Sequence, residues 1–346
     1  DEDEVATVYA HELGHIVHWD FAVMTLGATL TQILYLIYIF ARRMSQGDGK
    51  NQIKDALGHA AIAAYVFHLI GTYLLLYLSR TREYYADHFA AETTGNPNGL
   101  SRALVKIAYG IVEEGKRSTE PSRLVEGTRA LGIYDPKVAT STGTAYRIAS
   151  SPAKVGRVFL WDMFNPWGWW MELSSTHPLT GKRIRALSTY AEQLGLEMEF
   201  DMGRVMAEGR QLNQKRLNQT FAVDLLLYVA PWLGMGAGLL LASVGLLVGP
   251  QTLVSGFSLA LIGFGIGTLA QMVFMFPDFN DAPAKDVLTL MSDPYASPLR
   301  GQPVKLQGEL IGRGDAGAKL GSDLKLQDRG GMMYLHYSSR FGPIGN

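Results

Sequence analysis

The chain contains no cysteine and few charged residues. The absence of cysteine among its 346 residues excludes disulfides, thiolate zinc fingers, iron–sulfur clusters and a cysteine nucleophile. Charged residues make up 18% of the chain and hydrophobic residues 47%, whereas an average soluble domain is about 25% charged. The 31 basic and 32 acidic residues nearly cancel, so no basic field exists to attract nucleic acid, and no such partner is expected.

Three long stretches contain no Asp, Glu, Lys or Arg; they cover residues 21–41, 56–79 and 225–277. A helix needs about 20 apolar residues to cross a bilayer, so the last stretch, of 53 residues, has room for two helices separated at Gly249-Pro250-Gln251. The sequence therefore predicts four spans of a cell membrane, near 21–41, 57–79, 225–247 and 252–275. Buried helices of a soluble core are the alternative, but ordinary core helices are much shorter.

The remaining segments predict a mainly α chain with a small β region at its end. Residues 80–220 are polar and of helical character, including a helix over 100–114. After Pro277, residues 304–310, 323–328 and 332–337 alternate or run apolar between glycine turns, which predicts a small β domain, OB-like in type. The chain opens at Asp1 in an acidic run and shows no signal peptide, so we expect it to be a piece of a longer protein.

Glycine and tryptophan patterns bear on how the membrane region packs. The third and fourth spans carry Gly234-x-Gly236-x-Gly238 and Gly263-x-Gly265-x-Gly267. This small-residue spacing favours a tight helical hairpin or a homo-oligomer contact; glycine enrichment common to membrane helices is the alternative. A tryptophan cluster favours an anchor at the membrane interface over the lining of a substrate cleft. Its members are Trp161, Trp167, Trp169 and Trp170.

The strongest chemical signal is the run His11-Glu12-Leu13-Gly14-His15. Positions i and i+4 share one face of a helix, so both imidazoles can bind one Zn²⁺ ion. Glu12 is offset to one side, where it can hold a water on the metal and take its proton as a general base. A purely structural histidine pair is the weaker alternative, because this run arises by chance in only about one chain in a hundred.

A catalytic zinc site needs a third ligand and one open position. Glu83 is the candidate, because it directly follows the second predicted span and so emerges on the same side as His11 and His15. An ordinary ion pair with a neighbouring arginine is its alternative role. Asp87 lies one helical turn further on and is expected to accept the other ring N–H of a zinc-bound histidine, which fixes the tautomer.

Other histidines have weaker assignments. His177 is a candidate donor to the oxyanion or a residue of the substrate groove, with a structural contact at a helix start as the alternative; Arg183 could contribute likewise. His18 lies seven residues from His11, about 10.5 Å along a helix, so it cannot share a metal with it and is expected to pack or to form a hydrogen bond. His59 and His68 lie within predicted spans and are expected to bond to a neighbouring helix.

These residues together resemble the HtpX-like family of membrane zinc endopeptidases. The resemblance covers residues 1–190 and rests on the zinc-binding run with Asp20 after it, the pair of spans and Glu83-x-x-x-Asp87. Further matches are Thr94-Gly95-Asn96-Pro97, the helix containing Leu104-Val105-Lys106-Ile107, and Ser175-Thr176-His177-Pro178 followed by Arg183-Ile184-x-x-Leu187. The resemblance implies a helical gluzincin-type protease domain on the cytoplasmic side, which cleaves membrane or misfolded proteins in quality control. Carried over by position, His11, His15 and Glu83 are zinc ligands, Glu12 is the base, and Asp87 supports a ligand.

The sequence thus predicts a membrane-integral zinc endopeptidase with one Zn²⁺ per chain, a protein or peptide substrate and a lipid bilayer around it. The expected domains are a protease domain at 1–220 that includes the hairpin 21–79, a second hairpin at 221–277, and the β domain at 278–346. Each hairpin returns the chain to the side it left, and a slight excess of Lys and Arg favours the cytoplasm as that side. A CAAX-prenyl-protease-like enzyme and a non-catalytic, metal-bound membrane scaffold are the alternatives.

Overall fold

Helices make up most of the chain that the structure, a computed structural model, describes. It describes residues 2–46, 51–109, 144–145, 155–246, 252–275, 280–313, 323–328 and 332–336. Among the described residues, four helices are long and apolar enough to cross a membrane, and each overlaps one of the four predicted spans. They are Asp20–Ser45, Gln52–Thr94, Gln214–Ser243 and Gly256–Met275. The chain divides into two units, one formed by Asp1–Gly156 and Trp169–Met202, the other by Arg157–Gly168 and Gly203–Asn346.

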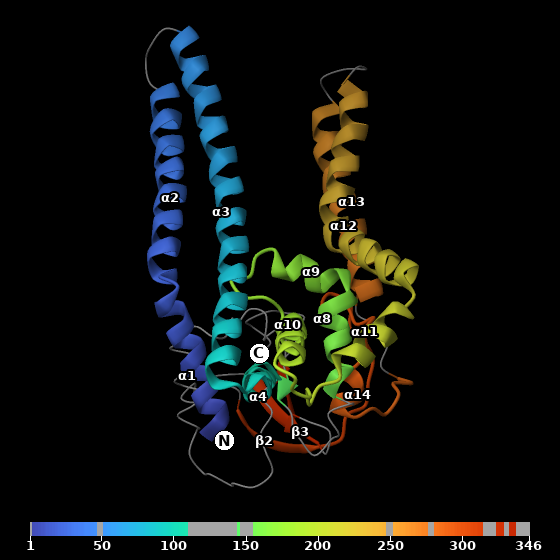
Figure 1. Cartoon of the computed structure of the whole chain (residues 1–346). Helices are drawn as coiled ribbons and strands as arrows, with labels where there is room; N and C mark the ends of the chain where they lie inside the picture. Colours follow the sequence, from blue (N-terminus) through green and yellow to red (C-terminus); the bar gives the residue numbers. More distant parts are fainter. Residues whose placement is uncertain are drawn as a thin grey trace. The chain divides into compact units, whose positions relative to one another are not determined.

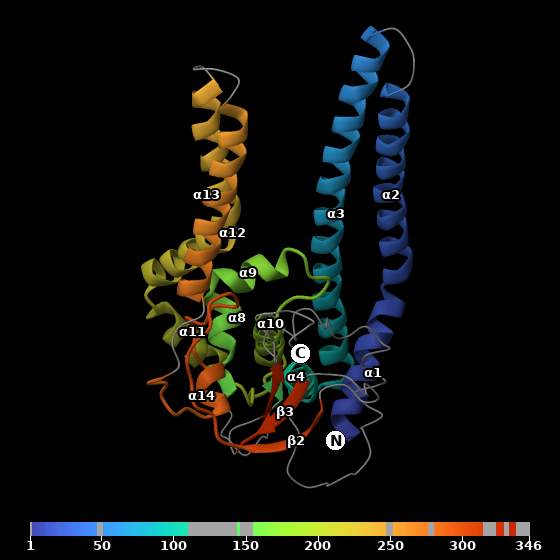
Figure 2. The same cartoon turned by 180° about the vertical axis from the view of Figure 1, so that it is seen from behind.

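The first unit is built on a helical hairpin. Its elements are α1 (Glu2–Val17), α2 (Asp20–Ser45), α3 (Asn51–Thr94), α4 (Pro97–Tyr109), β1 (Thr144–Ala145) and α10 (Thr180–Gln193). Helices α2 and α3 run side by side, and α1 continues from α2 beside the C-terminal part of α3 (Figures 1 and 2). A bend at Trp19, whose φ is 57°, separates α1 from α2. The hairpin therefore returns the chain to the end where α1 lies.

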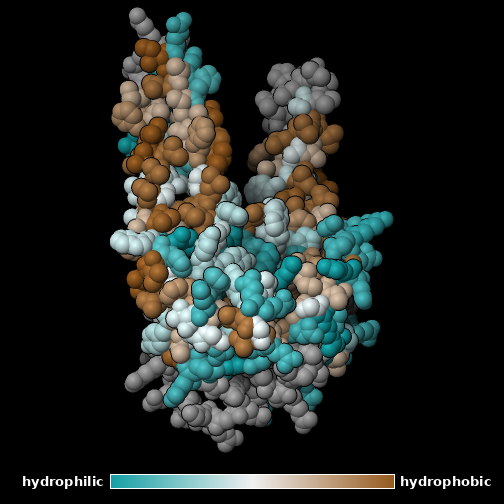
Figure 3. Space-filling view, viewed as in Figure 1, coloured by the Kyte–Doolittle hydropathy of each residue, from teal (hydrophilic) through white to brown (hydrophobic). Residues whose placement is uncertain are grey.

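Helix α3 is longer than a membrane span requires. Its 44 residues extend about 66 Å, whereas the hydrocarbon core of a bilayer is about 30 Å thick. Hydrophobic side chains cover much of the α2–α3 hairpin away from α1 (Figure 3). The charged and better buried C-terminal part of α3, from Arg80 onwards, therefore extends out of the apolar layer.

The junction of α3 and α4 follows from its sequence. Gly95 takes a φ of +61° directly after α3, a conformation that glycine adopts at little cost after a helix. The side chain of Asn96 accepts a hydrogen bond of 2.9 Å from the backbone N–H of Gly99 and so caps α4. Pro97 occupies the first helical position, where its missing N–H is not needed. This turn brings α4 back against α1 and α3.

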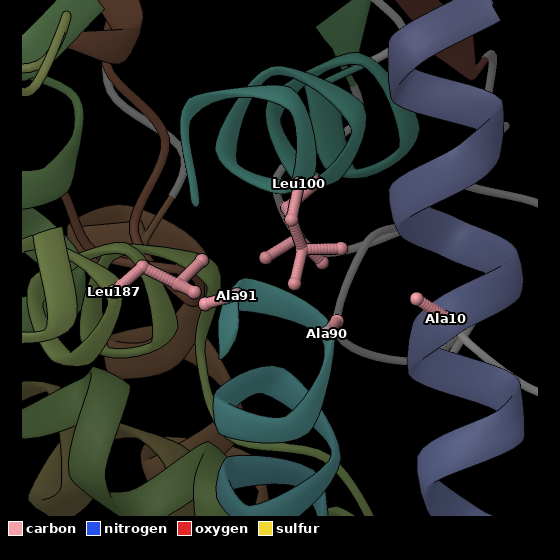
Figure 4. Close-up of a cluster of buried hydrophobic side chains, with 6 residues drawn as sticks. Ala10, Ala90, Ala91, Leu100 and Leu187 are labelled. Carbon is pink, nitrogen blue, oxygen red and sulfur yellow. The ribbon is translucent and has the colours of Figure 1, made fainter. Parts of the chain in front are cut away.

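Small and aliphatic side chains form the core where these helices meet (Figure 4). Ala10 comes from α1, Ala90 and Ala91 from α3, Leu100 from α4 and Leu187 from α10, and all are buried. The acidic start of α1 contributes as well, since Glu4 is buried and lies 2.8 Å from Lys106 of α4. Alanine on α3 lets the neighbouring helices approach closely, and this brings α1 and α10 next to the same stretch of α3.

The second unit contains the other apolar hairpin. Its elements include α8 (Phe159–Phe164), α11 (Met202–Arg210), α12 (Gln214–Leu246), α13 (Thr252–Met275), α14 (Val287–Met291) and the strands β2 (Glu309–Arg313), β3 (Asp323–Gln327) and β4 (Met332–His336). Helix α9 (Pro166–Glu172) lies across the boundary of the two units.

Glycines line the contact between α12 and α13. A Cβ on Gly234 would lie 2.0 Å from the carbonyl oxygen of Gly263, and a Cβ on Gly238 would lie 2.3 Å from the carbonyl oxygen of Leu259. Glycine therefore lets α12 and α13 pack as a tight hairpin, one of the interpretations that the sequence left open.

The three strands of this unit form an antiparallel sheet in which β3 lies between β2 and β4. Strands occur at two of the predicted positions, but the one predicted over 304–310 begins only at Glu309. Lys305 instead forms an isolated bridge with Ala284. An OB-like domain stays a prediction, and the turn predicted at 249–251 and the end of the helix predicted over 100–114 lie outside the described residues.

Candidate active site

Two histidines and a carboxylate converge between α1 and α3. The Nε2 atoms of His11 and His15 are 3.2 Å apart, and the Glu83 carboxylate lies 3.7 Å from the first and 3.5 Å from the second. Zinc bonds of about 2.0–2.1 Å in a tetrahedral arrangement place ligand atoms about 3.3 Å apart. The three side chains that the sequence predicted as ligands therefore lie together, and their atoms fit one metal ion.

Gly14 allows this convergence. A Cβ at this position would lie 3.1 Å from Cα of Ala86 and 3.2 Å from Cδ1 of Phe89, both on α3. The absence of a side chain lets α1 and α3 approach at a point one turn from Glu83. The glycine within the His-Glu-x-x-His run is therefore a packing residue as well as part of the zinc-binding motif.

Asp87 and Arg183 lie behind His11. Nδ1 of His11 is 3.0 Å from a carboxylate oxygen of Asp87, and the role of this aspartate as an acceptor of the ring N–H stays a prediction. Arg183 donates two hydrogen bonds to Asp87, of 2.9 and 2.6 Å, and lies 3.1 Å from Glu83. Burial alone raises the pKa of Asp87, but the charge of Arg183 and its hydrogen bonds hold that pKa well below its usual range. The buried arginine faces these two carboxylates, so its position suits it to orienting ligands.

A second carboxylate supports His15. Nδ1 of His15 donates a hydrogen bond of 2.6 Å to Asp20, and Arg82 pairs with the other oxygen of Asp20. Arg82 also donates to the backbone carbonyl of His18. In the sequence, Asp20 is only part of a family pattern, five residues after His15. The bend after α1 turns its side chain back toward the ring of His15, and this gives it a role in the site.

The carboxylates beside the two rings bear on which ring atoms face the centre. A carboxylate accepts a hydrogen bond, so Nδ1 of His15, which is bonded to Asp20, carries the proton and leaves the lone pair of its Nε2 atom facing His11. Nδ1 of His11 lies 3.0 Å from Asp87 but has no hydrogen-bond partner among the described residues. Glu83 adds a carboxylate at the same point. Two imidazole nitrogens and a carboxylate oxygen are ligands that Zn²⁺ takes in proteins, so the donor set fits a metal ion.

Glu12 lies next to this group. Its Oε1 atom is buried and has no hydrogen-bond partner within the described part of the chain. Burial raises the pKa of the Glu12 carboxyl above its usual value, an effect that the nearby charge of Glu83 increases. A partly desolvated carboxylate with a free oxygen is suited to accepting a proton.

His177 approaches the same group from a loop between α9 and α10. Its Nε2 atom is 3.8 Å from Glu83. The loop is attached to α3, since Ser79 donates a hydrogen bond of 2.9 Å to the carbonyl of Thr176 and Arg80 donates to the carbonyl of Ser175 at 2.9 Å. The structure thus brings together all the residues predicted for the site.

Other predicted positions lie elsewhere. Nδ1 of His18 donates to the carbonyl of Gly14 at 2.8 Å, and that of His68 to the carbonyl of Thr31 on the neighbouring helix at 3.1 Å, as expected for both. In the second unit Trp161 donates to the backbone of Ala296 and Trp167 to Asp224. Trp167 is buried, whereas Trp169 and Trp170 are 57% and 45% exposed; an interfacial anchor stays a prediction.

The chain is similar to known proteases over its first half and beyond. It is 37% identical to the protease HtpX homologue of Methanothermobacter thermautotrophicus over 34% of this chain and 44% of that protein. The corresponding homologue of Aeropyrum pernix is 33% identical over 56% of this chain and 60% of its own length, and that of Aquifex aeolicus 29% identical over 57% and 56%. The matches thus span about half the length of these relatives.

No solved structure matches the chain. The profile of Peptidase family M48 matches residues 1–191, a range that contains the whole group around His11, His15 and Glu83. The chain therefore belongs to Peptidase family M48.

Proposed function

We propose that this protein is a membrane-integral, zinc-dependent endopeptidase that hydrolyses peptide bonds of membrane or misfolded proteins. The observation that supports it most is the convergence of His11, His15 and Glu83 within 4.8 Å of one another, with the buried Glu12 beside them. Membership of a peptidase family and four apolar helices agree with this activity. The names of the relatives support proteolysis for those proteins and carry it to this chain as part of the proposal.

His11, His15 and Glu83 would hold one zinc ion, with Asp87 and Asp20 fixing the orientation of the two imidazoles. Zinc supplies Lewis-acid chemistry, since it polarises a carbonyl and makes water more acidic. Arg183 is a positioning residue that keeps Asp87 ionised. This network holds the rings in one tautomer and limits their movement before substrate arrives.

Glu12 acts as the general base in this proposal. Its free carboxylate oxygen takes a proton from the attacking water and passes the proton to the nitrogen of the leaving amine. The ring of His177, at the rim of the group, would donate a hydrogen bond to the oxyanion that forms at the scissile carbonyl. Both side chains act on atoms of the substrate or the water, so both are proposed as catalytic residues.

The substitution Glu12→Gln tests this chemistry. The purified variant is expected to keep one zinc per chain and to lose cleavage of an unfolded protein such as casein by a factor of at least about 10², because the amide cannot accept the proton. Glu2→Gln is the matched control, since Glu2 is exposed on the same helix and should leave the rate unchanged. Cleavage at the wild-type rate by a zinc-loaded Glu12→Gln protein would refute the mechanism.

Zinc stoichiometry tests the ligand set. The wild-type protein is expected to contain one zinc ion per chain, and Glu83→Ala much less, because two histidines alone leave the site short of a ligand. Full zinc in Glu83→Ala would remove the third-ligand assignment. Zinc in the wild type without any hydrolysis would favour a metal-bound scaffold, and cleavage of prenylated peptides alone would favour a CAAX-prenyl-protease-like enzyme.

The remaining organisation follows as part of the proposal. Residues 1–220, with the hairpin 21–79, would form the helical zincin-type protease domain, 221–277 a second membrane anchor and 278–346 a small β domain of OB type. The protease domain would face the cytoplasm. Gly236 and Gly265 have open space at the position of a Cβ, so they remain available for a homo-oligomer contact within the membrane.

A further inference from the structure

We propose that this site cleaves polypeptide at the membrane surface, close to the end of a membrane-spanning segment of the substrate. The inference rests on the proposed protease function and adds a position for the scissile bond. It follows from where the ligands lie relative to the ends of α2 and α3, both in the first unit.

The two helices of the hairpin leave the apolar layer at the same level. The uncharged stretch of α2 begins at Phe21, directly after Asp20, and that of α3 ends at Ser79. Arg82, three residues past this end, forms an ion pair with Asp20. Because the arginine and the aspartate are in contact, the first polar turn of each helix faces that of the other.

The ligands lie within a short distance of this level. Glu83 follows Ser79 by four residues, which corresponds to about 6 Å along a helix. His15 is bonded to Asp20 at 2.6 Å. The headgroup layer on each side of a bilayer is about 5–7 Å thick, so the metal-binding group lies at the depth of the headgroups or directly beyond them.

The loop that carries His177 is held at the same depth. Ser79 and Arg80, the last residue of the uncharged stretch and the first after it, donate hydrogen bonds to the carbonyls of Thr176 and Ser175. Arg80 also donates to the carbonyl of Glu172 at 2.7 Å. The loop is therefore attached to the turn of α3 at which the helix leaves the apolar layer.

Exposed tryptophans lie next to this loop. Trp169 and Trp170 precede it and are 57% and 45% exposed. Tryptophan favours the headgroup region, where its ring is partly in apolar surroundings and its N–H is hydrated. Trp19 and Phe21 at the start of α2 are also exposed, and their rings stack at 6.3 Å. Exposed aromatic side chains thus lie at the start of α2 and directly before the loop that carries His177.

This depth sets which peptide bonds the site can reach. An extended chain covers at most about 3.3–3.6 Å per residue, so five residues past the end of its own span a substrate reaches about 17 Å. That is enough for a site at the surface and too little for a site 30 Å from it. For longer tethers, the effective concentration of the cleavable segment at the site falls with about the −3/2 power of the tether length. Between tethers of 5 and 40 residues this is a fall of about 20-fold.

The experiment uses the full chain in lipid vesicles with three substrates that contain the same cleavable segment. In two of them a Gly/Ser tether of 5 or 40 residues joins the segment to a single spanning helix, on the side that carries α1; the third is the free segment. The expected result is cleavage about 20-fold faster with the short tether than with the long one. Equal rates, or faster cleavage with the long tether, would overturn the inference while the protease function stands. No cleavage of any of the three would refute the function as well.

Quenching of tryptophan fluorescence by lipids brominated near the headgroup tests the depth without activity. Replacing Trp169 and Trp170 by phenylalanine is expected to remove a part of the emission that the lipid quenches. Trp232→Phe, on the apolar part of α12, is expected to do the same and serves as the positive control. Trp167→Phe is the matched control, because Trp167 is buried and bonded to Asp224 and should contribute little that lipid quenches. Unquenched emission from Trp169 and Trp170 would overturn the placement of the loop at the surface.

Discussion

Replacing Gly14 by alanine sets two opposing effects against each other. Alanine in place of glycine inside a helix stabilises it by about 1 kcal/mol. The new Cβ, however, would lie 3.1 Å from Cα of Ala86 and 3.2 Å from Cδ1 of Phe89, whereas carbon atoms in contact are ordinarily about 3.5–4.0 Å apart. Helices α1 and α3 must therefore separate by about 0.5 Å at this point, and overpacking of this kind costs about 1–3 kcal/mol.

The separation acts directly on the metal-binding group. His11 and His15 lie on one of the two helices and Glu83 on the other, so a shift of about 0.5 Å exceeds the ±0.2 Å within which ligand distances are met. We expect the zinc dissociation constant of Gly14→Ala to rise about tenfold, equivalent to about 1.4 kcal/mol. A competition titration against a chromophoric chelator in detergent measures it.

Gly58→Ala is the matched control for this prediction. Gly58 lies on α3 and has open space at the position of a Cβ, so its replacement changes helix propensity alone and should leave zinc affinity unaltered. If Gly14→Ala bound zinc as tightly as the wild-type protein, the close approach of the two helices would not set the ligand geometry and the reasoning would fail.

Four further results are expected. Asp20→Asn should keep an oxygen that accepts the N–H of His15 but lose its charge, and lower zinc affinity about 10–100-fold in the same chelator competition. Gly234→Ala should destabilise the α12–α13 hairpin, because its Cβ would lie 2.0 Å from a carbonyl oxygen of α13, whereas Gly236→Ala should not; heating in detergent compares them. Leu100→Ala, at a side chain 1% exposed, should lower the free energy of unfolding by about 2–5 kcal/mol, measured by chemical denaturation. Removing the metal with a chelator should stop cleavage and lower the Tm, and added zinc should restore both, because an ion that binds only the native state stabilises it.

Each of these expectations has a result that contradicts it. Unchanged zinc affinity in Asp20→Asn would mean that its charge does not support the ligand. Equal effects of the two glycine substitutions would mean that α12 and α13 do not meet through Gly234. A Leu100→Ala protein as stable as the wild type would place that side chain outside the core, and full cleavage without metal would exclude a metal-dependent reaction.

The local part of the candidate site was predictable from the sequence. Two histidines four residues apart on a helix share a face whatever surrounds them, because the period of the helix is fixed. The length of the uncharged stretches predicted the four spans for a similar reason, since the thickness of the bilayer sets the length of a spanning helix. Counting spans then placed Glu83 on the side of His11 and His15.

Other roles were set by packing. The sequence presented Gly14 as one residue of a motif, Asp20 as a pattern match and Arg183 as a weak candidate for the oxyanion. The close approach of α1 to α3, the bend at Trp19 and the burial of α10 against α3 decide what these three residues contact. None of these features follows from a local period, because each depends on segments far apart in the chain.

The order of residues by itself determined the helices, the spans and the faces on which the histidines lie, since these depend on interactions over a few positions. Only the tertiary structure decided that the Glu83 carboxylate comes within 3.7 Å of both rings and which carboxylate supports each ring. The physical reason is that coordination and hydrogen bonding require distances set to a few tenths of an ångström, and only the packing of whole helices against one another fixes distances of that kind.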